Sequence, residues 1–164
     1  MVQTQKLDYL YFAEEDYKFV ANAYKAGIKG NPIGYLSEQS CEKYLKHLYC
    51  LMKDIDASEL TNTDNLFPKN AAHNVTKLAY YLKDSGLYIS RDVMNDIRVL
   101  NSDYFATRYP GISSYVMNEQ DIRDNVLAMK SVREFTMSAI KIIENQKEAE
   151  AEKKRNSEEI DFGI

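Results

Sequence analysis

The chain has 164 residues and a mass of 19.0 kDa, which is enough for one buried core and too little for two ordinary domains. Its composition is that of a globular protein, with 45% hydrophobic and 28% charged residues, and its 6 Gly and 3 Pro leave little material for turns. A formal net charge of -4 disfavours general coating of nucleic acid, so any contact with phosphate backbones would need a local basic patch.

The first half of the chain predicts two helices. Residues 5–26 carry apolar side chains at alternating spacings of three and four, which is typical of one helical face, and Gly27 ends that pattern. A loop over residues 27–34 leads to a second helix, whose stripe ends near Asp54. The stripe residues of this helix are Cys41, Leu45, Leu48 and Met52, with Glu42, Lys43 and Lys46 largely off it. Residues 55–70, rich in Asp, Ser, Thr and Asn, predict a loop.

The second half predicts three more helices. A short helix follows Asn74 and is closed by Gly86 as a left-handed cap. The next begins at Ser90 and runs until Pro110 forbids its continuation, and a long last helix is capped by Asn118. We therefore expect an all-α protein, an up-and-down bundle of four or five helices.

Residues 1–145 are expected to form the bundle, and residues 146–164 a charged helical extension and tail. One interpretation of the tail is a solvated helix end that frays. The other is a short linear peptide, in which Ile160, Phe162 and Ile164 enter a groove of a partner protein.

The sequence gives no sign of a metal, a cofactor or a membrane anchor. Cys41 and Cys50 are nine residues apart on one predicted helix, hence on opposite faces, and Cys41 is expected in the core. His47 and His73 are the only histidines, which argues against a structural zinc site. No stretch approaches the roughly 20 apolar residues of a membrane span, and no signal segment follows the polar residues 1–6, so we expect a cytoplasmic protein.

Several stretches together carry a resemblance to a known family. They are the first helix with Asp16, then SEQSCEKYLK at 37–46, HNVTKL at 73–78 and YFATRYP at 104–110. In this order the chain resembles a HEPN domain (higher eukaryotes and prokaryotes nucleotide-binding) over residues 8–143. The resemblance implies a helical bundle, often a homodimer, frequently encoded beside a minimal nucleotidyltransferase.

Many members of that family are ribonuclease toxins or defence effectors. The ribonucleases use an arginine followed four to six residues later by a histidine, because the arginine stabilises developing negative charge and the histidine moves protons near neutral pH. In this chain both histidines precede Arg91, which is the first arginine. The sequence therefore lacks the ribonuclease motif, and we expect no catalytic residues of that kind.

The resemblance and the helical spacing together select a candidate nucleotide- or phosphate-binding site of Arg108, Tyr109, Tyr104, Lys43 and Asp16. Arg108 lies one turn beyond Tyr104 and can hold a phosphate bidentately, or it can form an internal ion pair with Asp16. Tyr109 can stack on a base or end its helix as a core residue. Lys43 can reach the same phosphate or simply be solvated. His73 is expected to be a cap or a surface residue.

Three functions remain open from the sequence. The leading one is a non-catalytic protein that binds a nucleotide or an RNA end as the partner of a nucleotidyltransferase. The second is an atypical ribonuclease, a toxin or phage-defence component in which another group replaces the missing histidine. The third is a helical adaptor that recruits a protein through its tail.

Overall fold

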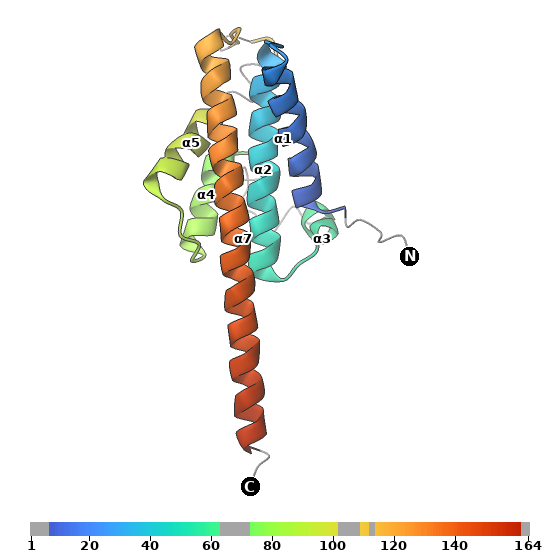
Figure 1. Ribbon diagram of the computed structural model, residues 1–164, viewed down its shortest axis with the longest axis vertical. Helices are drawn as coiled ribbons and strands as arrows, with labels where there is room; N and C mark the ends of the chain where they lie inside the picture. The colour runs from blue at the N-terminus through green and yellow to red at the C-terminus, as the bar shows by residue number, and fades with distance from the viewer. Residues whose placement is uncertain (1–6, 63–72, 102–108, 112–113, 162–164) are drawn as a thin grey trace.

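A computed structural model describes residues 7–62, 73–101, 109–111 and 114–161 of the chain. These ranges contain six helices and no strand, which confirms the all-α bundle (Figure 1). The helices are α1 (Tyr9–Lys25), α2 (Asn31–Lys53), α3 (Ala57–Asn62), α4 (Val75–Asp84), α5 (Arg91–Asn101) and α7 (Glu119–Asp161).

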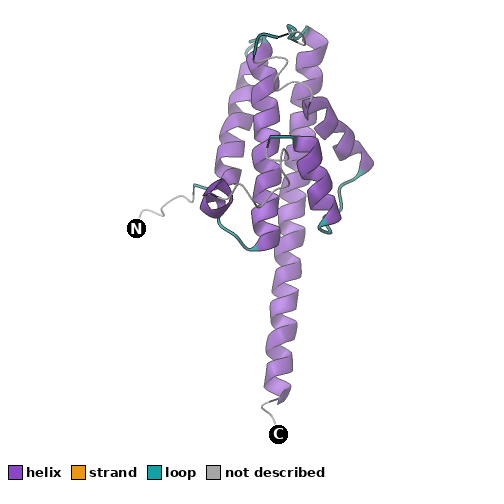
Figure 2. Ribbon diagram, turned by 180° about the vertical axis from the view of Figure 1, so that it is seen from behind, coloured by secondary structure: helices purple, strands orange, loops and turns teal. Residues whose placement is uncertain are grey.

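Helix α2 is the centre of the bundle. It packs against α1, α7, α4 and α5, and it also contacts the short α3. Seen from behind, α2 lies between α1 and the α4–α5 pair (Figure 2). Because neighbours surround it, α2 buries more than the predicted stripe, and Glu42, expected off that stripe, is only 9% exposed.

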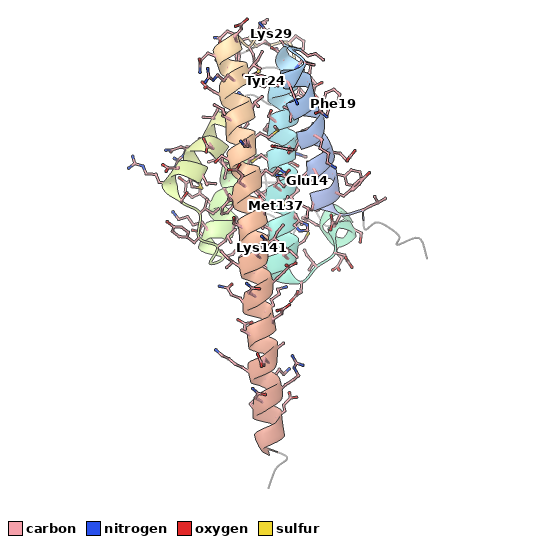
Figure 3. All side chains as sticks on the ribbon, viewed as in Figure 1. Glu14, Phe19, Tyr24, Lys29, Met137 and Lys141 are labelled. Carbon is pink, nitrogen blue, oxygen red and sulfur yellow. The ribbon has the colours of Figure 1, made fainter. Side chains whose placement is uncertain are left out.

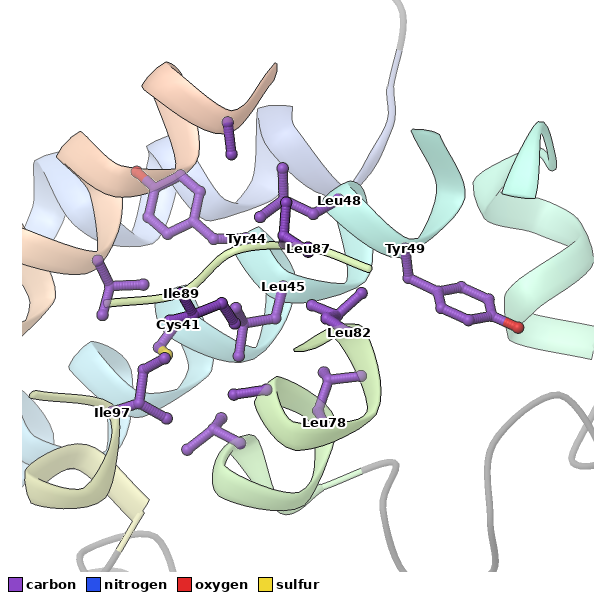
Figure 4. Close-up of a cluster of buried hydrophobic side chains, with 14 of the residues drawn as sticks. Cys41, Tyr44, Leu45, Leu48, Tyr49, Leu78, Leu82, Leu87, Ile89 and Ile97 are labelled. Atoms are coloured by element: carbon purple, nitrogen blue, oxygen red, sulfur yellow. The ribbon is translucent and has the colours of Figure 1, made fainter. Parts of the chain in front are cut away.

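The main core lies between α2, α4, α5 and α7. Leu45 and Leu48 of α2 are fully buried in the same cluster as Leu78 and Leu82 of α4 (Figure 4). Each fully buried leucine of this kind contributes about 1.5–3 kcal/mol to folding through the apolar surface that it removes from water. A second cluster joins α1, α2 and α7 at the other end of the bundle, and its members are Val20, Ala23, Ile33, Met117, Ile122 and Met129.

Polar side chains cap the helices where the sequence predicted them, and at one place where it did not. The Asn74 side chain accepts a hydrogen bond from the Lys77 amide at 2.9 Å, and the Asn118 side chain accepts from the Asp121 amide at 2.9 Å. Ser90 Oγ accepts from the Val93 amide at 3.3 Å. The cap that was not predicted is Asp8, whose side chain accepts a hydrogen bond from the Tyr11 amide at 3.0 Å. Helix α1 therefore begins at Tyr9 and not at residue 5.

Two other boundaries differ from the prediction. Helix α2 begins at Asn31 inside the expected loop, because Gly30 takes a φ of 126° and Pro32 is tolerated in a first helical turn. The short α3 was not predicted and lies inside the expected loop over 55–70. The polar residues there do not prevent a helix of 6 residues. The expected closure after α4 is confirmed, since Gly86 has a φ of 103°.

Helix α7 is 43 residues long and runs past the rest of the bundle (Figure 1). Lys147 pairs with Asp54 at the end of α2, and the residues at 148–158 are exposed. Residues 162–164, which include two positions of the proposed tail peptide, lie outside the described residues. None of the described helices combines the length and apolar character that a membrane crossing requires.

Candidate functional site

The surface of α2 between α1 and the start of α4 carries a group of charged side chains. We call it the α2 charge cluster and define it as Asp16, Glu42, Lys43, Lys46 and His73. Helix α1 supplies the first residue, α2 the next three, and the segment before α4 the last. Lys43 and Lys46 are three residues apart and Glu42 and Lys46 are four apart, so each of these two pairs shares a face of the helix.

Lys43 and Asp16 join α1 to α2 in this cluster. The Lys43 ammonium donates to Asp16 Oδ2, and the two side chains are 28% and 19% exposed. The pair is thus half-buried but in contact with solvent. An ammonium group has three N–H donors, so Lys43 keeps hydrogen-bonding capacity for a ligand while Asp16 holds it in place.

Glu42 connects Lys46 and His73. Its Oε1 accepts from the Lys46 ammonium, and its Oε2 lies 3.4 Å from His73 Nδ1. The Glu42 side chain is 11% exposed and that of His73 is 68% exposed, so a nearly buried carboxylate meets an open imidazole. The Lys46 ammonium also lies 5.8 Å from the centre of the Tyr9 ring. The cluster therefore offers two lysine ammonium groups and one exposed imidazole.

A second polar group lies between α1, α2 and α7 and serves the fold. The Glu14 carboxylate accepts hydrogen bonds from Arg133 and, at 2.5 Å, from the Tyr44 hydroxyl. Burial alone would raise the pKa of Glu14, but the bonds from Arg133 and Tyr44 and the positive charge of Arg133 lower it below its usual value. Burial first, and then the bond to Glu14, raise the pKa of Tyr44 well above its usual value. Neither Glu14 nor Tyr44 is therefore poised to exchange protons at neutral pH.

Cys41 is also excluded as a nucleophile. It is fully buried and free, as expected for a core residue. Burial, followed by the negative charges of Glu38 and Glu42, raises the pKa of its thiol well above the ordinary value. A thiol held in the protonated form is a poor nucleophile and a poor metal ligand. Cys50 is likewise buried and forms no disulfide bond.

His47, the other histidine, lines a cavity of about 250 Å³ at the base of α1 and α2. Its Nδ1 lies 4.0 Å from Asp8 Oδ2, and its side chain is 11% exposed. Asp54 and Asp56 line the same cavity. Across the described ranges, no three His, Cys, Asp or Glu side chains gather as a metal site would require.

The structure brings together only part of the predicted site. Lys43 and Asp16 are in direct contact, and Lys43 is therefore a paired residue and not a merely solvated one. Tyr109 is 50% exposed and is therefore not a core residue. Most of the helix turn before it lies outside the described residues, so its place at a helix end stays a prediction. Arg108 and Tyr104 lie outside the described residues, and their roles stay predictions. His73 is a surface residue, whereas the cap of α4 is Asn74.

Six residues of the two polar groups were not predicted as site residues, namely Glu42, Lys46, His73, Glu14, Tyr44 and Arg133. Glu42 and Lys46 are four residues apart, which is a recognisable spacing for an ion pair on a helix. The pairing of Glu14 with Arg133 spans 119 positions of sequence, and no local pattern signals it.

Comparison with protein families adds one finding to this geometry. The model of the HEPN domain matches residues 7–143 of the chain. Comparisons with curated proteins and with solved structures gave no match.

Proposed function

Because the chain belongs to the HEPN domain family, which has a nucleotide- or RNA-related function, we propose that it binds a nucleotide or an RNA end without cleaving it. The observation that carries the proposal is the α2 charge cluster. There Lys43 and Lys46 stand three residues apart on one helix, and a carboxylate positions each of them. A lysine ammonium group binds phosphate oxygens as a point charge.

The sequence supports the part of the proposal that excludes cleavage. A HEPN ribonuclease needs an arginine and a histidine at a fixed short spacing, and in this chain no arginine precedes a histidine. Arg108 and Tyr104 belong to the proposal as further phosphate and base contacts, and the half-exposed Tyr109 belongs to it as a ring that stacks on a base. Asp16 acts by holding Lys43.

Thermal melting of the full chain tests the proposal. Nucleotides and a short RNA with a 5′-phosphate are added to wild type, Lys43→Gln and Lys46→Gln, because a ligand that binds only the folded state raises the melting temperature. We expect a shift in wild type and a smaller one in both variants. Lys141→Gln, an equal charge change on the exposed surface of α7, is the control and should keep the full shift. No shift with any of these ligands would contradict the proposal.

We further propose that the chain acts with a separately encoded nucleotidyltransferase. The support is the family alone, and the test is whether the neighbouring gene encodes such an enzyme and whether the two purified proteins co-elute on gel filtration. Separate elution at micromolar concentrations would count against this pairing.

One observation favours a second candidate function, an atypical ribonuclease of the toxin or phage-defence type. His73 is open to solvent with its ring against Glu42, and such a pair can accept and return a proton. RNA cleavage that His73→Ala abolishes would select this function over the first.

A further inference from the structure

An apolar groove lies beside α7 near the point where that helix leaves the bundle. A cavity of about 250 Å³ opens there between α7 and the segment that links α4 to α5 (Figure 1). Among its lining residues, Leu87, Ala139 and Ile143 are buried, whereas Tyr88 and Ile142 are 82% and 55% exposed. We call this cavity the α7 groove. It offers apolar surface that a binding partner would remove from water.

The face of α7 that lines the groove continues past the bundle with little charge. At about 100° per residue, several positions fall within about 40° of one line along the helix. These positions are Ile142, Gln146, Ala149, Lys153, Asn156 and Ile160. We call this line the α7 stripe. Lys153 is its only charged member, although the sequence around it is KEAEAEKKRN at 147–156. A weakly charged line between charged flanks is typical of a surface that packs on another helix.

The described part of the chain leaves this stripe open beyond the bundle, since residues 148–158 are exposed. Ile160 lies five full helical turns after Ile142, which separates the two by about 27 Å along the axis. Phe162 and Ile164 follow within four positions of Ile160, and four residues span at most about 14 Å. These apolar residues therefore cannot return to the groove of their own chain.

The stripe is complementary to itself when two copies run antiparallel. If Ile142 of one copy lies opposite Ile160 of the second copy, the same register sets two further pairs opposite each other. They are Gln146 with Asn156, and Ala149 with Lys153. The first of these pairs joins two amide side chains, each of which can donate and accept a hydrogen bond. A two-fold axis repeats every contact, as in a symmetric dimer interface.

The charges beside the stripe fit the same register. Glu150 and Glu152 lie about 80° to either side of the stripe. In the antiparallel pair they flank Lys153 of the second copy, so the lysine of each copy meets two carboxylates of the other. A single lysine in an otherwise uncharged line between helices reduces stability but selects one register and one oligomeric state.

We propose that the α7 stripe is a contact surface between two copies of this chain, whose α7 helices pair antiparallel over residues 142–160. In this register residues 160–164 of each copy lie opposite residues 138–142 of the other, a stretch that lines the α7 groove. The occupant of the groove is thus this segment of the second copy. Its apolar residues are Ile160, Phe162 and Ile164. The inference does not depend on the proposed nucleotide binding, and it assigns an interface to the expected homodimer.

Disulfide trapping in the full chain tests the register. Ile142→Cys and Ile160→Cys are made as separate variants, and each is oxidised alone and in an equal mixture. We expect a disulfide-linked dimer in the mixture and none above background in either variant alone, because the two copies of position 142 are about 27 Å apart in this register. Wild type, in which Cys41 and Cys50 are buried, gives the background. Cross-linking of Ile142→Cys alone, as efficient as in the mixture, would overturn the proposal.

Charge reversal tests the same surface without a cysteine. Lys153→Glu opposes Glu150 and Glu152 of the second copy, and we expect the dimer to dissociate about tenfold more readily in analytical ultracentrifugation. The matched control is Lys154→Glu, which makes the same charge change about 120° around the helix from the stripe and should alter the dissociation constant less than about threefold. Circular dichroism verifies that the variants keep their helical content.

Mixing restores opposite charges across the contact. A chain with Glu150→Lys and Glu152→Lys should associate with the Lys153→Glu chain about as tightly as wild type does with itself. A wild type that stays monomeric would overturn the proposal and leave the groove to a different protein. A dimer that Lys153→Glu leaves unchanged, or no recovery in the mixture, would also overturn it and show that another surface joins the two copies.

Discussion

Arg133 of α7 donates two hydrogen bonds to the carboxylate of Glu14 of α1, from Nε to Oε1 at 2.7 Å and from Nη2 to Oε2 at 2.9 Å. The guanidinium also lies over the Tyr17 ring, with its carbon 4.7 Å from the ring centre. Glu14 lies on the part of α1 that faces α7 (Figure 3). This contact joins the first and last described helices.

Removal of one partner of this contact should destabilise the fold. Arg133→Ala leaves the Glu14 carboxylate without its cation in a site that is only 20% exposed, and we expect a loss of about 2 kcal/mol in the free energy of unfolding. Tyr44→Phe removes a single hydrogen bond and should cost about 1 kcal/mol. Urea unfolding followed by circular dichroism measures both. Lys18→Ala breaks the exposed pair with Glu15 and should cost less than about 0.5 kcal/mol.

The Glu14 carboxylate should make the free energy of unfolding depend on pH in the acidic range. The pKa of Glu14 is lower in the folded chain than its ordinary value of 4.5, so the folded state binds this proton less readily than the unfolded state does. The stabilisation is present above pH 4.5 and is lost as pH falls through the folded pKa. Urea unfolding of wild type and Glu14→Gln from pH 7 to pH 3 tests this. The difference in stability between the two should shrink toward acid pH, and a constant difference would argue against Glu14 as its source.

We expect the purified protein to leave total RNA intact, because the arginine-to-histidine spacing of the family's ribonucleases is absent. Incubation with RNA in the presence of chelator, analysed by gel, measures this. Cleavage that both Arg108→Ala and His73→Ala abolish, at equal purity, would support the atypical ribonuclease instead.

Arg108 should matter more for ligand binding than for folding. Asp16, its other suggested partner, is already paired with Lys43, so Arg108→Ala should change the melting temperature little without ligand. The variant should reduce the shift that nucleotides cause, and Arg108→Lys should keep part of it, because a lysine retains charge but not bidentate geometry. Strong destabilisation by Arg108→Ala, relieved by Asp16→Ala, would instead make Arg108 a structural residue.

A homodimer is expected in solution. Apolar side chains remain on the surface of the described residues, among them Phe19 at 60% exposure, Tyr88 at 82% and Ile142 at 55%, and families of this kind commonly pair. Light scattering over a range of concentrations measures the mass. A concentration-independent mass of 19.0 kDa would exclude the dimer.

Local sequence determined five of the six described helices, but not the short α3 or the first residues of α1 and α2. Apolar spacings of three and four located the first helix, the stripe of α2 and the core face of α7, since a helix of 3.6 residues per turn repeats a face at those steps. Asn74, Ser90 and Asn118 were recognisable caps, because a side-chain oxygen beside free backbone amides is a local arrangement. The family could likewise be assigned from short motifs in a fixed order, and the family comparison confirmed it.

The tertiary structure alone decided which charged residues meet. Glu14 and Arg133 are 119 positions apart, and Lys43 reaches Asp16 across 27. Arg98 donates a hydrogen bond to the Tyr80 hydroxyl only because α4 and α5 pack against each other. Helical periodicity gives each residue an angle around its own helix, but no pattern within one helix says which neighbour covers that angle. The packing of the helices decides which neighbours meet. It places Glu42, which was expected at the surface, in a nearly buried position in contact with Lys46 and His73.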